Sequence, residues 1–196
     1  MKKQANCVAY RLCIWLGVGL LVVAAVLLTS WQWGIRASRQ KATGYVQTII
    51  ARIPAPQSAV PEERGNNTMP VLSVDGVDFV GVLEMPRYGS NLPVAANWGK
   101  VSDHPCLFDG SVYDRTLKIG ATTQNGQYDF YRDISVGDAI SFTDMEGNRF
   151  SYAVASIRYE KHADQATLSQ QDAALTLFIK NVYAFEYIVI FCDVLS

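Results

Sequence analysis

The sequence predicts a mostly β domain held behind one N-terminal transmembrane helix. Two observations lead to this fold class: a long uncharged apolar run near the N-terminus, and a series of short apolar segments separated by turn residues from Val71 onward. A chain of 196 residues has room for one compact domain beside a span, but not for two ordinary domains. We therefore expect a single folded domain over residues 71–196.

The transmembrane helix is predicted over residues 12–33, a stretch without a charged side chain. As a helix rising about 1.5 Å per residue, this stretch covers a hydrocarbon core of roughly 30 Å. Trp15, Trp31 and Trp33 near its ends are typical of membrane interfaces. A cleaved signal peptide is the alternative, but its apolar core is normally only about 7 to 15 residues long.

Basic residues do not determine the orientation of the span. Three of them precede it and four follow it closely: Lys2, Lys3 and Arg11, then Arg36, Arg39, Lys41 and Arg52.

The predicted domain is acidic, because residues 73–196 carry nine Lys and Arg against sixteen Asp and Glu, a net charge of 9 − 16 = −7. Such a domain repels phosphate backbones, so we expect no nucleic-acid partner.

Between the span and the domain, two further segments are predicted. Apolar residues recur at helical spacing over residues 34–53, which predicts a juxtamembrane helix ending at Pro54. Residues 54–70 are rich in Pro, Asn, Gln and Glu, and we interpret them as a linker.

Seven strands are predicted from alternating or continuous apolar runs: 79–85, 92–95, 117–121, 139–143, 150–160, 175–179 and 187–194. The runs over 175–179 and 188–191 hardly alternate, which predicts strands covered on both faces. The acidic segment 144–148 is interpreted as a hairpin turn. A calcium-binding loop is the alternative for this segment. However, the Gly that such a loop requires is displaced, and the twelfth position of the loop, normally a Glu, would be Ala155.

Several short motifs, in order and at matching spacing, resemble one family. They are Gly81-Val82-Leu83-Glu84-Met85-Pro86 with Leu92-Pro93-Val94, Pro105-Cys106 with Gly110-Ser111-Val112-Tyr113, Val136-Gly137-Asp138, Phe142 to Tyr152, and Leu175-Thr176-Leu177-Phe178. Behind an N-terminal anchor, this set resembles the sortases, cysteine transpeptidases that attach surface proteins to Gram-positive cell walls, and especially class B-like Firmicutes sequences. The resemblance implies a closed β-barrel with short helices. It also implies a single-pass protein of the cell membrane, with residues 1–11 in the cytoplasm and the domain outside.

In sortases a Cys attacks a backbone carbonyl of a sorting peptide, a His moves protons and an Arg stabilises the oxyanion. Motif by motif, the position of the His falls on Thr122 and that of the Cys on Lys180. The position of the Arg, about seven residues further on, falls on Tyr187. The resemblance therefore implies a scaffold without the family's catalytic groups.

Other catalytic sets are considered from the residues themselves. Cys106 and Cys192 are the candidate thiols of the domain, and His104 and His162 the candidate bases. Cys192 follows an apolar run and is expected to be a buried structural thiol. Whether it pairs with Cys106 stays open. Lys180 could serve as an amine nucleophile only if its pKa were lowered by burial. No metal-ligand spacing occurs, so we expect neither a metal nor a cofactor.

We expect a catalytically inactive sortase-like protein that binds a peptide or partner in cell-wall protein sorting or pilus assembly. The expected partners are a sorting-signal peptide, a pilin-like protein or an active sortase. Candidate groove residues are Tyr183, Phe185, Tyr187 and His162. Two alternatives stay open: an active transpeptidase or peptidase with unconventional residues, and a purely structural surface module.

Overall fold

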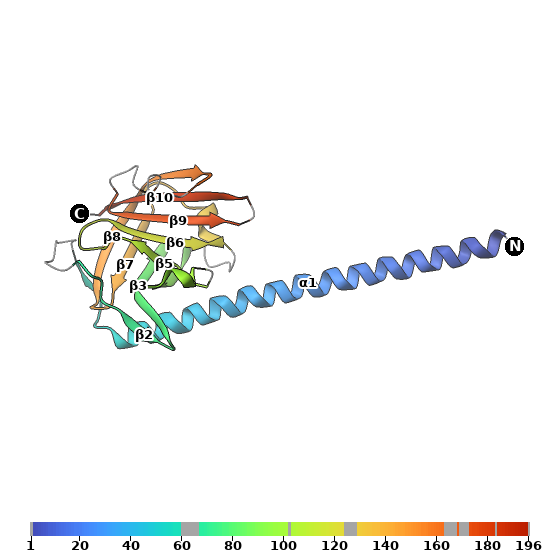
Figure 1. Cartoon of the computed structure of the whole chain (residues 1–196), viewed down its shortest axis with the longest axis horizontal. Helices are drawn as coiled ribbons and strands as arrows, with labels where there is room; N and C mark the ends of the chain where they lie inside the picture. The colour runs from blue at the N-terminus through green and yellow to red at the C-terminus, as the bar shows by residue number, and fades with distance from the viewer. Residues whose placement is uncertain are drawn as a thin grey trace. The chain divides into compact units, whose positions relative to one another are not determined.

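The computed structural model separates into two compact units, residues 1–37 and 38–196, which are described one at a time. It describes residues 2–59, 67–101, 103–123, 129–162, 168, 173–182 and 184–195, without the side chains of residues 2–13, Trp31, Ile35 and Asp129. Figure 1 shows helix α1 (Lys2–Arg52) and a set of strands that follows it.

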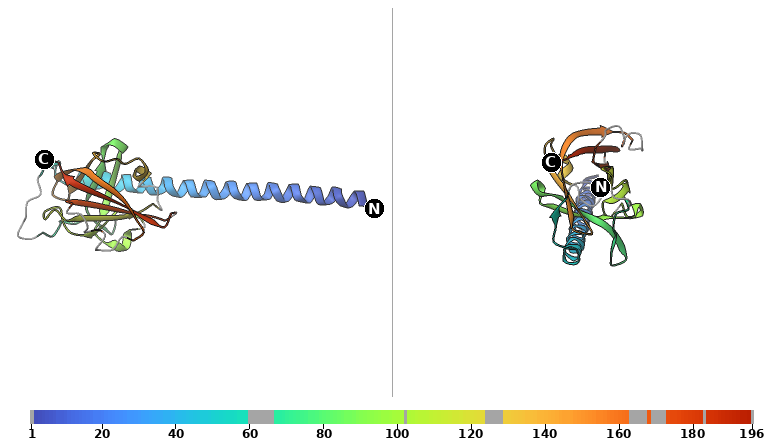
Figure 2. Two further views of the ribbon diagram at one scale, coloured as in Figure 1. Left: turned by 90° about the horizontal axis from the view of Figure 1, so that it is seen from above. Right: turned by 90° about the vertical axis from the view of Figure 1, so that its left-hand side faces the viewer.

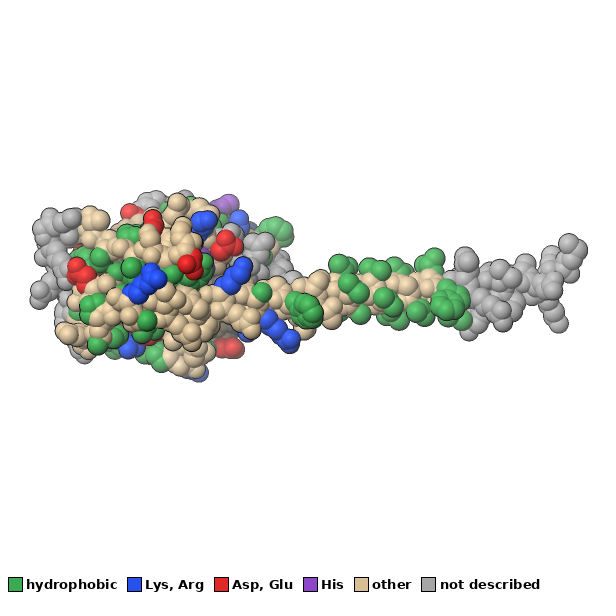
Figure 3. Space-filling model, turned by 90° about the horizontal axis from the view of Figure 1, so that it is seen from below, with side chains coloured by type: hydrophobic (Ala, Val, Ile, Leu, Met, Phe, Trp, Pro, Cys, Tyr) green, Lys and Arg blue, Asp and Glu red, His purple; other side chains and the backbone are tan. Residues whose placement is uncertain are grey.

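The first unit consists of the N-terminal part of α1. The described residues of α1 contain an apolar window with a mean hydropathy of 2.2, long and apolar enough to cross a membrane. Leu21 is 72% exposed and Trp15 75%, and Figure 3 shows hydrophobic side chains along the visible face of this stretch. By length and composition, this exposed apolar stretch is a candidate membrane span.

Helix α1 continues without interruption past residue 33, where the sequence predicted a boundary between two helices. No proline lies between Lys2 and Arg52, and Gly34 alone costs only about 1 kcal/mol of helix stability. The helix ends at Arg52, because the residue before Pro54 is biased away from the helical region. The juxtamembrane segment predicted from the sequence ends at residue 53, one residue later.

The second unit is a closed β-barrel, as the resemblance implied (Figure 2). Eight of the strands in the described part of the chain form its ring: β3 (Val77–Met85), β4 (Ser90–Ala95), β5 (Cys106–Asp109), β6 (Leu117–Thr122), β9 (Leu175–Asn181), β10 (Glu186–Val194), β8 (Asn148–Glu160) and β7 (Ala139–Asp144). Because β7 pairs with both β8 and β3, the ring closes. All seven predicted strands are present.

The interior of the barrel holds the main hydrophobic core. Alternate side chains of the strands point inward, and the largest fully buried ones include Tyr152, Phe142, Phe150 and Leu83. Each such side chain stabilises the fold by about 1.5–3 kcal/mol relative to exposure. Gly81 and Leu83 of the Gly81-Val82-Leu83 motif face this core, and a Cβ on Gly81 would come within 2.2 Å of the Phe142 ring.

The part of α1 within the second unit packs on the outside of the barrel. Val46 and Ile49 are buried against Phe79, Val82 and Ala95 of the facing strands. This second core exists because residues 42, 46 and 49 recur at helical spacing and share one face. The sequence predicted that stripe.

Part of the segment predicted as a linker belongs to the sheet. Gln57–Ser58 form strand β1, parallel to β8, and the Gln57 N–H donates to the Gly147 carbonyl at 2.8 Å. The Ala59 N–H donates to the Arg149 carbonyl at 2.8 Å. β2 (Leu72–Val74) pairs with β3. These strands and β5 were not predicted, since runs of two to four residues carry no readable alternation.

The acidic segment 144–148 is a hairpin turn between β7 and β8. The Asp144 carboxylate accepts hydrogen bonds from the Glu146 and Asn148 N–H groups, from the Asn148 side-chain amide and from the Tyr113 hydroxyl. Four donors occupy the acceptor sites of one carboxylate. Asp144 therefore ties the turn together from a fully buried position.

Candidate functional site on the outer face of β6, β9 and β10

The three residues matched to the sortase catalytic positions lie side by side on adjacent strands. β6 and β9 are parallel, and Thr122 pairs with Lys180. β9 and β10 are antiparallel, and Lys180 pairs with Tyr187. Because neighbouring strands are about 4.8 Å apart, these three residues, 7 to 65 positions apart along the chain, form one short row across the sheet.

This row lies on the outer face of the barrel. The inward residues of the three strands belong to the main core: Leu117, Ile119, Ala121, Leu175, Leu177, Ile179, Ile188, Ile190 and Cys192. The alternate residues Phe178, Val189 and Phe191 form a separate cluster on the opposite face, against which Tyr187 packs. By the same alternation, Thr122 and Lys180 project outward with Tyr187.

The three side chains differ in exposure and contacts. Lys180 is exposed, whereas Thr122 and Tyr187 are half-buried. The Thr122 Oγ1 atom is buried and has no hydrogen-bond partner among the described residues. The neighbouring Thr123 Oγ1 accepts from the Val182 N–H at 3.2 Å, which joins the end of β6 to the β9–β10 turn.

An aromatic cluster covers the same face beside this row. The ring centroids of Trp98 and Phe178 are 5.7 Å apart, and Phe108 lies 5.1 Å from each of them. Gly120 makes room for the cluster, because a Cβ there would approach both Trp98 and Phe178 to 2.5 Å. Gly120 and Phe178 come two residues before Thr122 and Lys180, so the cluster fills the outer face next to the row.

Solved structures with the same architecture exist. Sortase A from Corynebacterium diphtheriae aligns with a TM-score of 0.52 at 14% identity, covering 85% of this chain and 84% of that one. Sortase C1 from Streptococcus agalactiae gives 0.52 at 14% identity, covering 64% and 72%. Sortase C from Clostridium perfringens, with the C-terminal cell wall sorting motif, gives 0.51 at 16% identity, covering 67% and 78%.

The fold is a sortase fold. At these identities the likeness establishes the architecture alone. No family model matches the sequence, and no curated protein matches it either.

Two thiols lie in this sortase-like barrel, both buried and free. Burial raises the pKa of the Cys106 thiol to about 12, and it also raises the pKa of Cys192 well above its ordinary value. Cys106 Sγ donates to the carbonyl oxygen of His104 at 3.4 Å, and the buried His104 Nδ1 atom has no hydrogen-bond partner among the described residues. His104 packs between the rings of Tyr45 and Phe79 in the core beneath α1.

The predicted groove residues lie at one end of the sheet, where the structure describes them. Phe185, in the turn between β9 and β10, is 85% exposed and has a positive φ of 53°, an unusual conformation for a bulky residue. His162 is exposed and lies two residues beyond Glu160, which pairs with Tyr187. Tyr183 lies outside the described residues.

Three residues of this face were not predicted from the sequence. Trp98 and Phe108 come from segments far from β9 in the chain, and no local sequence pattern predicts that they contact Phe178. Arg158 on β8 lies 5.2 Å above the Phe191 ring. Arg158 pairs with Val189, which lies two residues from Tyr187 along β10.

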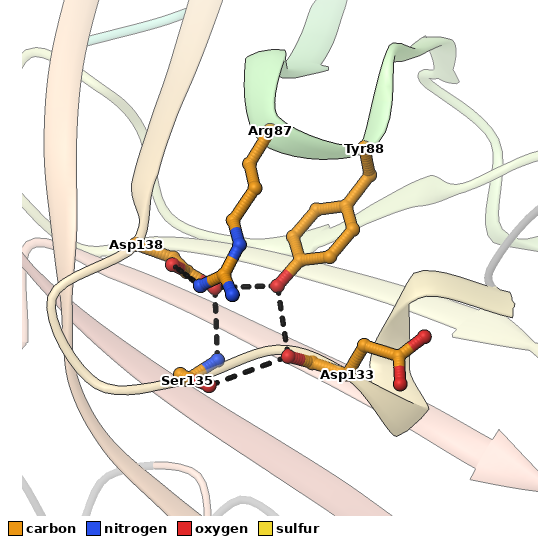
Figure 4. A network of polar contacts seen from close by, with 5 residues as sticks. All are labelled: Arg87, Tyr88, Asp133, Ser135 and Asp138. Carbon is orange, nitrogen blue, oxygen red and sulfur yellow. Dashed lines mark hydrogen bonds and ion pairs between the residues drawn. The ribbon is translucent and has the colours of Figure 1, made fainter.

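The Val136-Gly137-Asp138 motif has a structural role in this sortase fold (Figure 4). The Asp138 carboxylate accepts from the Arg87 guanidinium at 2.5 Å, the Tyr88 hydroxyl at 2.5 Å and the Ser135 N–H at 2.9 Å. Burial acts to raise the pKa of Asp138, but these donors outweigh it and the pKa lies below its ordinary value. The network fastens the turn before β7 to residues 87 and 88.

Proposed function

We propose that this chain is a membrane-anchored, extracytoplasmic sortase-like protein that has lost the transpeptidase reaction and binds a peptide or partner protein. The observation that carries the proposal is the register that sets Thr122, Lys180 and Tyr187 in one outward-facing row. A row of this kind offers a hydroxyl, an ammonium and a phenol in place of a thiol, an imidazole and a guanidinium. The class B-like assignment within the family rests on the sequence motifs.

The chemistry of these groups supports inactivity. A thiolate is the nucleophile in cysteine transpeptidases, and a group that titrates near neutral pH must protonate the leaving amine. A Thr hydroxyl does not titrate in that range, and Lys180 offers an amine where the reaction needs a thiol. Buried Cys106 and Cys192 carry raised pKa values, so neither supplies a thiolate to this face.

Binding requires only shape, apolar contact and hydrogen bonds, so it can persist after chemistry is lost. Exposed aromatic surface next to the row supports this half of the proposal, since Phe185, Trp98 and Phe108 are 85%, 41% and 37% exposed. A sorting-signal peptide is the first candidate ligand, because the Clostridium perfringens sortase C structure contains such a motif. A pilin-like protein or an active sortase presenting an extended segment would use the same contacts.

The membrane half of the proposal rests on the apolar part of α1. Its exposed Leu, Val and Ile side chains suit a single-pass anchor with the barrel outside the cell. The protein would then act at the outer surface of the membrane that holds it.

The proposal is tested with the full chain in detergent micelles and a fluorescent sorting-signal peptide, with and without an amine acceptor. We expect saturable binding and no cleavage. Phe185→Ala should weaken binding about tenfold, because exposed aromatic anchors are frequent hot spots. Val136→Ala is the matched control, since Val136 is 65% exposed in the turn before β7. Cleavage by the unaltered chain would refute inactivity, and an equal effect of both variants would refute binding at this face.

A structural module without a ligand groove is the second candidate function. The Trp98–Phe108–Phe178 cluster favours it, because these rings occupy the face on which an extended peptide would lie. The triple variant Thr122→His, Lys180→Cys and Tyr187→Arg separates the two candidates. Peptide cleavage by this variant would show an open groove, whereas no binding by either form would favour the structural module.

A further inference from the structure

A cavity of about 600 Å³ lies within the second unit, between α1 and the start of β4. Its size is within the range of small-ligand and peptide sites. The lining combines one helix face with one strand and one short helical turn: Arg39, Ala42, Thr43, Val46, Gln47 and Ile50, then residues 88–92, Phe130 and Asp133. None of these residues belongs to β6, β9 or β10, so the cavity is separate from the site proposed above.

The strand that borders the cavity, β4, has an open edge. β4 pairs with β3 along its whole length, from Ser90 to Ala95. On the other side it pairs with β5 only at Ala95, opposite Cys106. Within the described part of the chain, no backbone hydrogen bond outside the β3 pairing reaches Ser90, Asn91 or Leu92.

Pro93 determines which backbone groups point toward this edge. Pro93 lies opposite Val82 on β3 and has no N–H, which suits a pair of the non-hydrogen-bonded kind. Bonded and non-bonded pairs alternate along antiparallel strands, so Asn91, opposite Glu84, is again of the non-bonded kind. The N–H and C=O of Asn91 therefore point away from β3, toward the open edge.

An unpaired strand edge is a template for another strand, and proteins usually protect it with charges, bulges or a covering element. Ser90, Asn91 and Leu92 carry no charge themselves and, among the described residues, have no backbone partner beyond β3; α1 leaves a cavity at this place instead of filling it. A bound strand would satisfy the Asn91 backbone groups and occupy the cavity at the same time.

We propose that this cavity binds an extended segment of a partner protein, which adds a strand to β4 through the backbone of Asn91. Side chains of a strand alternate between two faces, so every second side chain of the segment lies on the same side as Leu92 and Phe130, which line the cavity and belong to the main core. The others face the polar part of the lining. Arg39 and Asp133 give the lining one charge of each sign, which favours a segment without net charge.

The test uses the full chain in detergent micelles and a blocked eight-residue peptide of alternating Val and Thr with a fluorescent label. We expect saturable binding and slower hydrogen exchange of the Asn91 amide in the complex. A peptide N-methylated at alternate residues keeps its side chains but lacks half of its N–H groups. It should bind at least about tenfold more weakly, because strand addition depends on main-chain hydrogen bonds.

A matched pair of variants isolates the backbone contact. Asn91→Pro removes the outward N–H at an edge position where proline is tolerated, and it should weaken binding about tenfold or more. Asn91→Ala keeps the N–H and should bind within about twofold of the unaltered chain. Far-UV circular dichroism reports whether each variant keeps the barrel. If Asn91→Pro does not fold, exchange of the Asn91 amide in the unaltered chain decides.

Three results would overturn the proposal: undiminished binding by Asn91→Pro, equal binding of the N-methylated peptide, or an Asn91 amide that exchanges equally fast with and without peptide. Loss of binding in Phe185→Ala instead would place the peptide on the outer face of β9 and β10. Because the two sites share no residue, failure of one leaves the other standing.

Discussion

Trp98, Gly120 and Phe178 should be energetically coupled, and a double-mutant cycle measures the coupling. Trp98 is 41% exposed, so about 59% of a side chain that buries up to about 250 Å² is covered, or about 150 Å². At about 25 cal/mol per Å², reduced by 10–40% because unfolded chains are not fully extended, Trp98→Ala should cost about 2–3 kcal/mol.

Gly120→Ala acts on the same cluster by overpacking. Its Cβ would lie 2.5 Å from both aromatic rings, and forced repacking of this kind costs about 1–3 kcal/mol. Once Trp98 is absent, the Phe178 ring can move into the vacated space and the clash is relieved. The double variant should therefore cost about the same as Trp98→Ala alone, which gives a coupling energy of at least about 1 kcal/mol.

The assay is urea unfolding of the four proteins in detergent micelles, followed by far-UV circular dichroism so that removing a Trp does not affect the signal. Gly44→Ala is the control, because nothing lies within 4 Å of a Cβ at that helical position. It should stabilise the chain by about 0.5–1 kcal/mol. Additive costs within about 0.5 kcal/mol for Trp98→Ala and Gly120→Ala would refute the inferred packing.

Two further predictions concern a histidine and a glycine. Burial lowers the pKa of His104, so the unfolded chain takes up a proton at higher pH than the folded chain. The free energy of unfolding should therefore fall as the pH drops below about 6.5. In thermal unfolding, the stability of His104→Phe should depend less on pH than that of the unaltered chain. Gly110 has a φ of +75°, and a Cβ there would lie 2.0 Å from the Thr116 carbonyl oxygen. Gly110→Ala should therefore cost more than about 3 kcal/mol in urea unfolding, whereas Gly89→Ala, at φ +58° with open space, should cost about 1 kcal/mol. Equal losses of unfolding free energy in Gly110→Ala and Gly89→Ala would contradict the account of Gly110. Parallel pH profiles of stability for the unaltered chain and His104→Phe would contradict the account of His104.

The sequence was informative wherever the physical signal is local. The strands at 117–121 and 175–179 were predicted because each is an apolar run between turn residues, and the stripe at residues 42, 46 and 49 identified the face of α1 that is buried. β1 and β5 were missed because a pairing of two to four residues depends on distant partners. Propensity within such a short window carries no information about those partners.

The candidate site, too, was only partly predictable from the sequence. Chain order and motif spacing matched Thr122, Lys180 and Tyr187 to the catalytic positions, but only the register of three strands sets them in one row. The approach of Trp98 to Gly120 spans the chain between η2 (Trp98–Lys100) and β6, and no periodicity encodes it. Likewise, the open edge of β4 depends on how short the β5 pairing is, and that becomes visible only in the folded chain.

The placement of the row on the outer wall of the barrel has a consequence for how such a protein can change over generations. Hydrophobic burial inside the ring is contributed by one set of alternating side chains, and the row belongs to the other set. Substitutions at positions 122, 180 and 187 therefore leave the packing inside the ring unchanged. In a scaffold arranged in this way, the chemistry of the outer wall can change without altering the burial that holds the ring together.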